Sequence, residues 1–204
     1  NTTGQYNTAV GYGALQYNTI GTQNVAIGMN ALWANTTGID NVAVGKSALQ
    51  DNTTAKYNTA IGTWALKVNT TGQFNTAVGR QTLQANTIGH QNVAIGQGAM
   101  FSNITGEENT AVGNNALYTN TIGQYNTAVG QSALTSNTTG TGNAAVGRNA
   151  LGFSTIGRYN AAIGYETLRY NTTGNYNTAV GSLSLHDNTT GVENVAIGRQ
   201  ALAN

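Results

Sequence analysis

The sequence predicts an all-β protein, a parallel β-solenoid (β-roll) of 12 coils in which each coil is one copy of a 17-position repeat. Two observations carry this prediction. The unit N-[TVA]-A-[VI]-G-x-x-A-L-x-x-N-T-[TI]-G-x-x recurs without insertion or deletion along all 204 residues. Pro, which cannot donate to a hydrogen-bond ladder, is absent. Repeat positions are numbered 1 to 17 from the first Asn of this unit.

A fixed period this short indicates a single domain over residues 1–204, because each unit packs only on its neighbours. The last copy is partial, and residues 1–6 supply the six positions that it lacks. The copies begin at Asn7, Asn24, Asn41, Asn58, Asn75, Asn92, Asn109, Asn126, Asn143, Asn160, Asn177 and Asn194.

Two segments of each unit have the length of a strand. Positions 1 to 4 (24–27, for example) and positions 8 to 11 (31–34) are each followed by a turn rich in Gly, Asn or Thr. Recurring Gly leaves no run of about ten good helix formers. Each strand is expected to lie beside its own copy in the next coil, which gives parallel sheets and a rod roughly 58 Å long at about 4.8 Å per coil.

The recurring apolar residues predict a core. Position 4 is always Val or Ile, and position 9 is always Leu apart from Met100. We expect both to form buried columns. The predicted core residues are Val10, Leu15, Ile27, Leu32, Val44, Leu49, Ile61, Leu66, Val78, Leu83, Ile95, Met100, Val112, Leu117, Val129, Leu134, Val146, Leu151, Ile163, Leu168, Val180, Leu185, Ile197 and Leu202.

The variable positions indicate the surface. All 15 charged and all 15 aromatic residues occur at positions 6, 7, 10, 11, 16 and 17, which are expected to face water. Position 17 carries aromatic residues that are expected to stack along one side as a contact surface: Tyr6, Tyr57, Phe74, Tyr125, Tyr159 and Tyr176.

Position 3 is Ala in every copy and lies on the opposite strand face from positions 2 and 4. If Val, Ile and Leu fill the coil, this Ala marks the close approach of another backbone from outside. Burying one Val or Ile and one Leu gives roughly 3 to 6 kcal/mol per coil, whereas ordering the backbone and side chains of one coil costs on the order of 20 kcal/mol or more. The difference favours lateral packing of several chains.

The Asn at position 12 admits two interpretations. It can form a stacked amide ladder at the turn, each side chain bonding the backbone or its neighbour. Alternatively, it can carry a glycan, because eight of these residues begin an Asn-x-Thr sequon: Asn1, Asn35, Asn52, Asn69, Asn103, Asn137, Asn171 and Asn188. Four other copies break the sequon, so a glycan on every coil is not predicted.

Residues that carry chemistry are few. His90 and His186 occupy different repeat positions and have no matching constellation of Asp and Ser, so we expect no catalytic residue, no metal ligand and no cofactor site. The net charge of +1 offers no basic footprint for nucleic acid. No apolar run approaches the length of roughly 18 residues that a membrane span requires. The chain is not expected to be an enzyme.

The motif N-[TVA]-A-[VI]-G-x-x-A resembles the N-S-V-A-I-G-type repeats in the heads of trimeric autotransporter adhesins (YadA-like heads), and the NTAVG-AL repeats of tail-fibre-like surface proteins. The resemblance covers all 204 residues. It implies a left-handed roll, three chains packed about a common axis, and an adhesive rod outside the cell. It also implies that Val10 and its equivalents point into the roll, with Ala9 and Gly11 at close backbone contacts.

We therefore expect a non-enzymatic extracellular structural fibre or adhesin-type rod, at the cell surface or in a virion fibre. The expected partners are copies of the same chain, as a trimer or a head-to-tail fibre, and a host-surface or glycan receptor. Head-to-tail stacking is expected because residue 1 continues the repeat in phase after residue 204. The alternative is an ice- or carbohydrate-binding solenoid, since Thr recurs at position 13 in 11 of 12 units.

Overall fold

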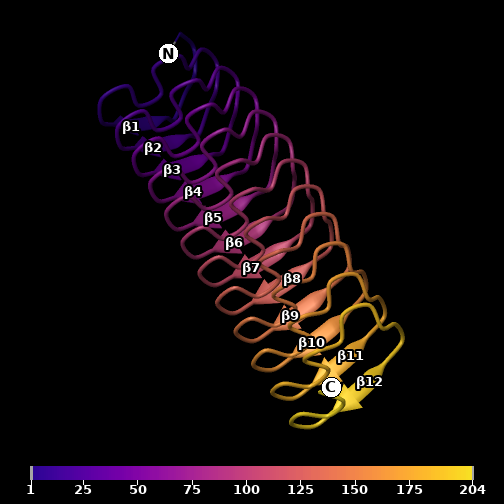
Figure 1. The fold of residues 1–204 in the computed structure, drawn as a ribbon. Helices are drawn as coiled ribbons and strands as arrows, with labels where there is room; N and C mark the ends of the chain where they lie inside the picture. The colour runs from indigo at the N-terminus through magenta and orange to yellow at the C-terminus, as the bar shows by residue number, and fades with distance from the viewer. Residues whose placement is uncertain (1, 204) are drawn as a thin grey trace.

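A computed structural model describes residues 2–203. It confirms the all-β prediction: 12 strands form one parallel sheet, in the order β1 to β12 (Figure 1). The strands are β1 (Thr8–Val10), β2 (Val25–Ile27), β3 (Val42–Val44), β4 (Thr59–Ile61), β5 (Thr76–Val78), β6 (Val93–Ile95), β7 (Thr110–Val112), β8 (Thr127–Val129), β9 (Ala144–Val146), β10 (Ala161–Ile163), β11 (Thr178–Val180) and β12 (Val195–Ile197).

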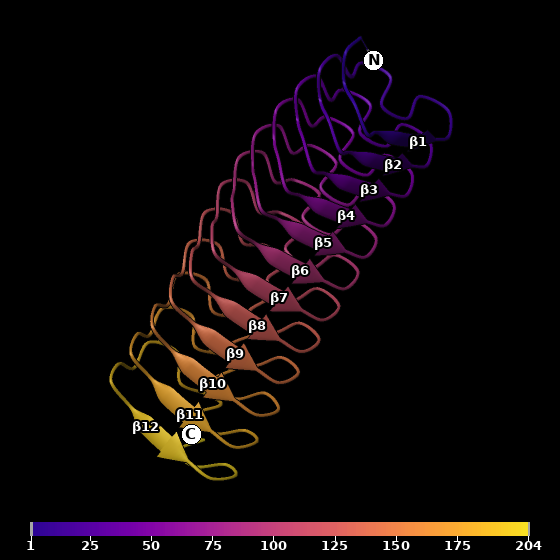
Figure 2. The ribbon, with the colours of Figure 1, turned by 180° about the vertical axis from the view of Figure 1, so that it is seen from behind.

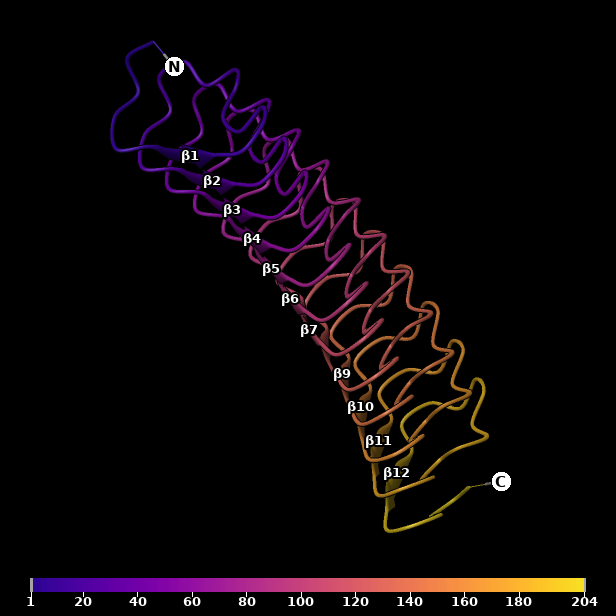
Figure 3. The same ribbon diagram turned by 90° about the vertical axis from the view of Figure 1, so that its left-hand side faces the viewer.

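Each strand pairs with its own copy in the next coil. In the first pair Thr8 lies opposite Val25, Ala9 opposite Ala26 and Val10 opposite Ile27, and the same register holds along the whole sheet. The coils therefore stack as a β-solenoid, and the view from behind shows the strands in one row (Figure 2). Seen from the side, the strands line one wall of the rod and the turns form the rest (Figure 3).

The predicted second strand, at positions 8 to 11, is wrong. That segment is a turn, and its position-9 residue, Leu or Met100, adopts a left-handed backbone in each coil, with φ of 48° at Leu66 and 52° at Leu117. A left-handed L-residue costs roughly 1 to 2 kcal/mol. Hydrogen bonds between coils offset the cost, because the Leu32 N–H donates to the Ala48 carbonyl at 3.0 Å. Sharp bends of this kind close each coil within one short repeat.

The Gly at position 5 ends each strand with a close approach between coils. Gly28 has a φ of +129°, and a Cβ added there would lie 2.7 Å from the carbonyl carbon of Gly45. Only glycine fits that backbone at that spacing. The close backbone contact expected at Gly11 and its equivalents is therefore confirmed.

The Leu at position 9 forms the predicted interior column. It is buried from Leu15 to Leu185, with Met100 filling the same place in its coil, whereas Leu202 in the last coil is 60% exposed. The Ala residues at positions 3 and 8 complete the apolar interior, as Ala26 and Ala31 do in the second coil.

The prediction that position 4 is buried is wrong. Val10 is 57% exposed, and Ile27 and Ile61 are about 40% exposed. Several others are half-buried, but all of them lie on the outward strand face, opposite the buried Ala. The residues concerned are Val10, Ile27, Val44, Ile61, Val78, Ile95, Val112, Val129, Val146, Ile163, Val180 and Ile197.

The width of the coil explains the reversal. A three-residue strand presents positions 1, 3 and 5 to one side and positions 2 and 4 to the other. The Leu side chain fills most of the interior, so position 3 admits only a residue as small as Ala. The Asn at position 1 also lies inside, where its amide hydrogen-bonds to the Asn of the neighbouring coil. Ala60, expected against another chain, is thus fully buried within its own coil.

Candidate functional site

Two ladders of buried Asn run along the interior. At position 12 the Asn35 Nδ2 donates to Asn18 Oδ1 at 2.8 Å and to the Gly38 carbonyl at 3.1 Å. The predicted amide ladder is therefore present. The second ladder, at position 1, was missed: Asn41 donates to Asn24 Oδ1 from both its backbone N–H, at 3.0 Å, and its Nδ2, at 3.1 Å. An Asn that never varies between coils was the available signal.

The glycosylation interpretation is contradicted by the position-12 ladder. The sequon residues Asn35, Asn52, Asn69, Asn103, Asn137 and Asn171 are fully buried. Asn188 is half-buried and its Nδ2 donates to Asn171 Oδ1. An N-linked glycan would be attached to the Asn Nδ2 and would therefore displace the hydrogen bonds of the ladder. Asn1 lies outside the described residues.

The position-12 ladder is interrupted once, at Ser154. The Asn137 Oδ1 and the Ser154 Oγ are buried, and neither has a hydrogen-bond partner among residues 2–203. On the far side of the gap, Asn171 again donates to the Gly174 carbonyl, at 3.0 Å. Two successive coils therefore carry one unsatisfied polar atom each, which is a local weakness.

The Thr row at position 13 is also a structural ladder. The Thr19 Oγ1 donates to the Thr36 carbonyl at 2.9 Å, and Thr121 Oγ1 does the same to Thr138 at 2.9 Å. Because these hydroxyl protons are directed to the neighbouring coil, this row does not present the regular set of water-ordering groups on which the ice-binding alternative depended.

The outward face of the sheet, hereafter the sheet face, consists of positions 2 and 4 of all 12 coils. Position 2 is Thr, Val or Ala, and position 4 is Val or Ile. No charged residue occurs at either position in any coil. The sheet face is thus an uncharged row in which the Val or Ile of position 4 lies beside Thr, Val or Ala of position 2, partly exposed in most coils and spaced by the separation of parallel strands, about 4.8 Å.

The aromatic residues at position 17 are exposed, and those on successive coils stack. Tyr57 and Phe74 lie with ring centroids 5.0 Å apart, and Tyr159 and Tyr176 lie 5.4 Å apart. This confirms the predicted stacking for adjacent coils. Between Tyr125 and Tyr159 the position is Gly142, and a Cβ added there would be 2.6 Å from the Tyr159 ring. Tyr6, the remaining member, is 82% exposed.

Further rings stack at positions 10 and 11, on another corner of the coil. Phe101 and Tyr118 are 5.0 Å apart, and Phe153 and Tyr170 are 5.2 Å apart, with nearly parallel planes. The Arg169 guanidinium lies 5.4 Å from the centroid of Tyr170. Sequence reasoning placed these residues on the surface but did not predict the pairs.

One cluster of charged residues contradicts the expectation that position 7 always faces water. Glu166 is only 9% exposed, and its Oε1 lies 2.7 Å from Arg169 Nη1. Burial by itself would raise the pKa of Glu166, but hydrogen bonds from Asn149, Tyr165 and Arg169, together with the charge of Arg169, outweigh it and hold that pKa below its ordinary value.

The two histidines differ in their surroundings. His186 Nδ1 lies 2.6 Å from Asp187 Oδ1, and its Nε2 lies 3.7 Å from Glu166 Oε2. His90 Nδ1 accepts a hydrogen bond from the Gln73 N–H at 3.0 Å. Within residues 2–203 no group of three or more His, Cys, Asp or Glu is arranged to hold a metal ion.

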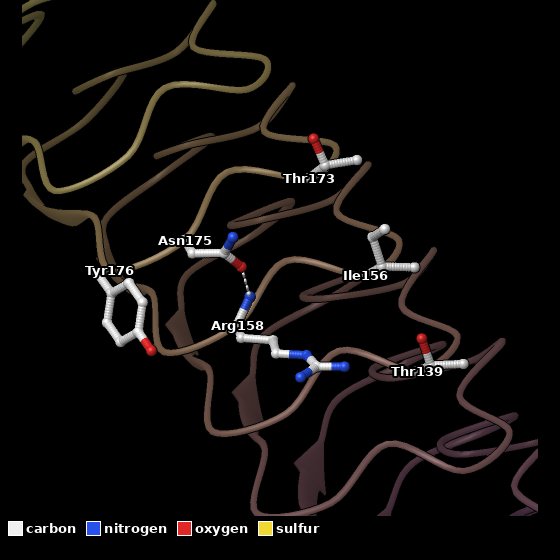
Figure 4. Close-up of a pocket in the computed structure, with 6 residues that line it drawn as sticks. All are labelled: Thr139, Ile156, Arg158, Thr173, Asn175 and Tyr176. Atoms are coloured by element: carbon white, nitrogen blue, oxygen red, sulfur yellow. Dashed lines mark hydrogen bonds between the residues drawn. The ribbon is translucent and has the colours of Figure 1, made fainter.

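Two hollows open on the strip formed by positions 14, 16 and 17. The first, of about 400 Å³, is lined by Thr139, Ile156, Arg158, Thr173, Asn175 and Tyr176 (Figure 4). The second, of about 390 Å³, is lined by Gln73, Phe74, His90 and Gln91. Each is bordered by the second ring of a stacked pair, Tyr176 or Phe74. Both are open surface grooves.

The fold and these surfaces define a parallel β-solenoid with structural amide ladders inside and a patterned exterior. Comparison with protein-family models, with curated proteins and with solved structures gives no match. Among the described residues, no helix has the length and apolar character needed to cross a membrane.

Proposed function

We propose that this chain is a non-enzymatic structural rod of an extracellular or cell-surface fibre, and that copies associate laterally along the sheet face. The observation that carries the proposal is the sheet face itself. It runs the length of 12 coils without a charge, and Ile27, Ile61 and Ile95 each leave about 40% of their surface exposed. Soluble monomers rarely expose a continuous apolar patch larger than a few hundred Å².

The free energy gained by burying the sheet face is large enough to support association. Seven of the twelve position-4 side chains are at least 39% exposed. Burying the exposed two fifths of a Val or Ile gives roughly 1 kcal/mol, or about 7 kcal/mol from these seven on each of the associating chains. Association costs roughly 4 to 15 kcal/mol in lost freedom of motion. A row as long as the rod can therefore hold copies together, whereas a single coil could not.

The shape of the row favours a closed homo-oligomer. Every coil contributes a Val or Ile at position 4 in the same register, so a second or third copy can align its own row coil by coil. Closed cyclic symmetry satisfies such a self-complementary patch on every chain. Three copies around a common axis agree with the resemblance to the trimeric adhesin heads, and leave the position-17 aromatics as the outward contact surface.

The test compares two sets of substitutions of equal chemistry. The first replaces Ile27, Ile61 and Ile95 on the sheet face with Lys. The matched control replaces Ile20, Ile88 and Ile122 with Lys, because these position-14 side chains are 55%, 47% and 53% exposed but lie among Thr residues. Sedimentation velocity and light scattering report the mass.

The proposal predicts a wild-type mass that is a whole multiple of the chain mass, a monomeric sheet-face variant and an assembled control. A wild type that stays monomeric at high concentration would rule it out. So would a control variant that dissociates as readily as the sheet-face variant. Fractionation of the source cells with an antibody against the chain tests the extracellular location separately.

A second candidate function, ice binding, has one specific observation in its favour. The sheet face combines flatness with Thr at position 2, as in Thr59, Thr76, Thr110 and Thr127, at the regular spacing of parallel strands. Thermal hysteresis measured on a monomeric wild type would favour it. Its loss on changing Thr59, Thr76 and Thr110 to Lys would place the activity on the sheet face.

A further inference from the structure

The hollow around Arg158 is lined by an arginine, whereas the hollow around Phe74 is not. Arg158 is exposed, and no ion pair joins it to an acid within residues 2–203. Its backbone N–H donates to Asn175 Oδ1 at 2.8 Å, which fixes the amide at the edge of the hollow. In Figure 4 the guanidinium extends across the groove toward Thr139.

The other groups around this hollow are neutral and of two kinds. Thr139, Ile156 and Thr173 follow one another on successive coils and form one rim, with hydroxyl, apolar and hydroxyl groups in order (Figure 4). The opposite side carries Asn175 and the Tyr176 ring, which is 58% exposed. The groove thus combines a cation, several hydrogen-bonding groups and apolar surface within about 400 Å³.

We propose that the Arg158 hollow binds a carboxylated sugar residue of an acidic glycan. A guanidinium pairs with a carboxylate through two parallel hydrogen bonds. The amide and the hydroxyls match sugar hydroxyl groups, and Tyr176 and Ile156 match the apolar face of a sugar ring. An open groove suits one unit of a chain that continues past it on both sides.

The distribution of charge favours this ligand over a nucleic acid. Nucleic acid carries one charge per about 3.4 Å of each strand and is held by many cations. Arg158 is the single basic side chain lining the hollow, and the chain has a net charge of only +1. The second hollow, around Phe74, is lined at positions 16 and 17 by Gln73, His90 and Gln91 and contains no arginine, so it supplies a comparison site without a guanidinium.

The inference adds a ligand to the outward surface of the proposed rod and does not require lateral assembly. The probes are tetragalacturonic acid, its methyl ester and α2,3-sialyllactose, measured by calorimetry and by saturation-transfer NMR. The proteins are the wild type, Arg158→Gln and, as a matched control, Arg148→Gln, an exposed arginine in the same coil at position 6. Each of the three proteins is measured again after it also receives the Lys substitutions at Ile27, Ile61 and Ile95. A failure of lateral assembly and a failure of glycan binding are then distinguishable.

The expected result is binding of at least one carboxylated probe, a Kd raised at least about tenfold by Arg158→Gln, and no change with Arg148→Gln. The methyl ester should bind weakly and equally to all three proteins. Absence of binding to both carboxylated probes would overturn the proposal. An equal loss in Arg148→Gln, or equally tight binding of a poly-glutamate peptide, would overturn it in favour of general attraction to anions.

Discussion

At the scale of single residues, buried amides govern how well one coil fits the next. Away from Ser154, a ladder Asn is satisfied by its own coil and by a neighbour, as Asn120 Nδ2 is by the Gly123 carbonyl at 3.0 Å and by Asn103 Oδ1 at 2.8 Å. An unsatisfied buried polar atom costs about 1 to 3 kcal/mol. A single substitution at Ser154, where the ladder is interrupted, is therefore expected to increase the stability of the fold.

Changing Ser154 to Asn should raise the free energy of unfolding by about 1 kcal/mol, because the new amide gives Asn137 Oδ1 a donor. Urea denaturation followed by circular dichroism measures the change. Ser136→Asn, a partly exposed substitution of the same chemistry, is the control and should have little effect. A lower midpoint for Ser154→Asn would mean that the larger side chain does not fit.

Glu166 should make stability depend on pH. Its folded-state pKa lies below the ordinary value of 4.5, so the carboxylate stabilises the fold at higher pH, and this contribution is lost as the pH falls through the lowered pKa. Glu166→Gln should be less stable than the wild type at pH 7, and the difference should shrink at low pH. Denaturation midpoints measured from pH 7 to pH 3 test this, with Glu107→Gln, in a turn of another coil, as control. A constant difference across that range would contradict the assignment.

At the scale of the strand and its turn, the orientation of one coil decides which apolar residue is core. Leu66 and Ile61 belong to the same coil, yet Leu66 is fully buried while Ile61 is 41% exposed. The alternation of the short strand turns Ile61 outward. The left-handed backbone of Leu66, with a φ of 48°, belongs to the turn that closes the coil.

Leu66→Asp should destabilise the chain by several kcal/mol, because it buries an unpaired carboxylate. Ile61→Asp should change the stability of the dilute single chain by less than about 1 kcal/mol, since surface substitutions have small effects. Thermal melting at low protein concentration compares the pair. Equal destabilisation by both would show that position 4 is part of the core after all.

At the scale of the whole molecule, the sheet face links stability to concentration. If copies associate along it, dilution should lower the melting temperature, because binding that favours the folded state stabilises by mass action. The Lys variant of Ile27, Ile61 and Ile95 should melt at the same temperature at every concentration. Calorimetry over a hundredfold dilution makes the comparison. A wild-type melting temperature that does not move would contradict lateral association.

The sequence by itself determined the period, the parallel solenoid, the buried Leu column and the exposed aromatic rows. These follow from recurrence, because a residue type that returns every 17 positions occupies one place in every coil. The position-12 ladder was predictable for the same reason. The hollow around Arg158 was not, since it depends on side chains that vary between coils.

Only the tertiary structure decided which strand face lies inside. Both faces carry residues that recur in every coil, Val or Ile at position 4 on one and Asn and Ala on the other, and hydrophobicity favours Val and Ile for the interior. The narrow space inside so short a coil decides otherwise. Leu49 fills it, Ala43 leaves the room that Leu49 needs, and the amide of Asn41 bonds the coils on either side and its own turn. Val44 is thereby turned outward, because close packing admits no second large side chain there.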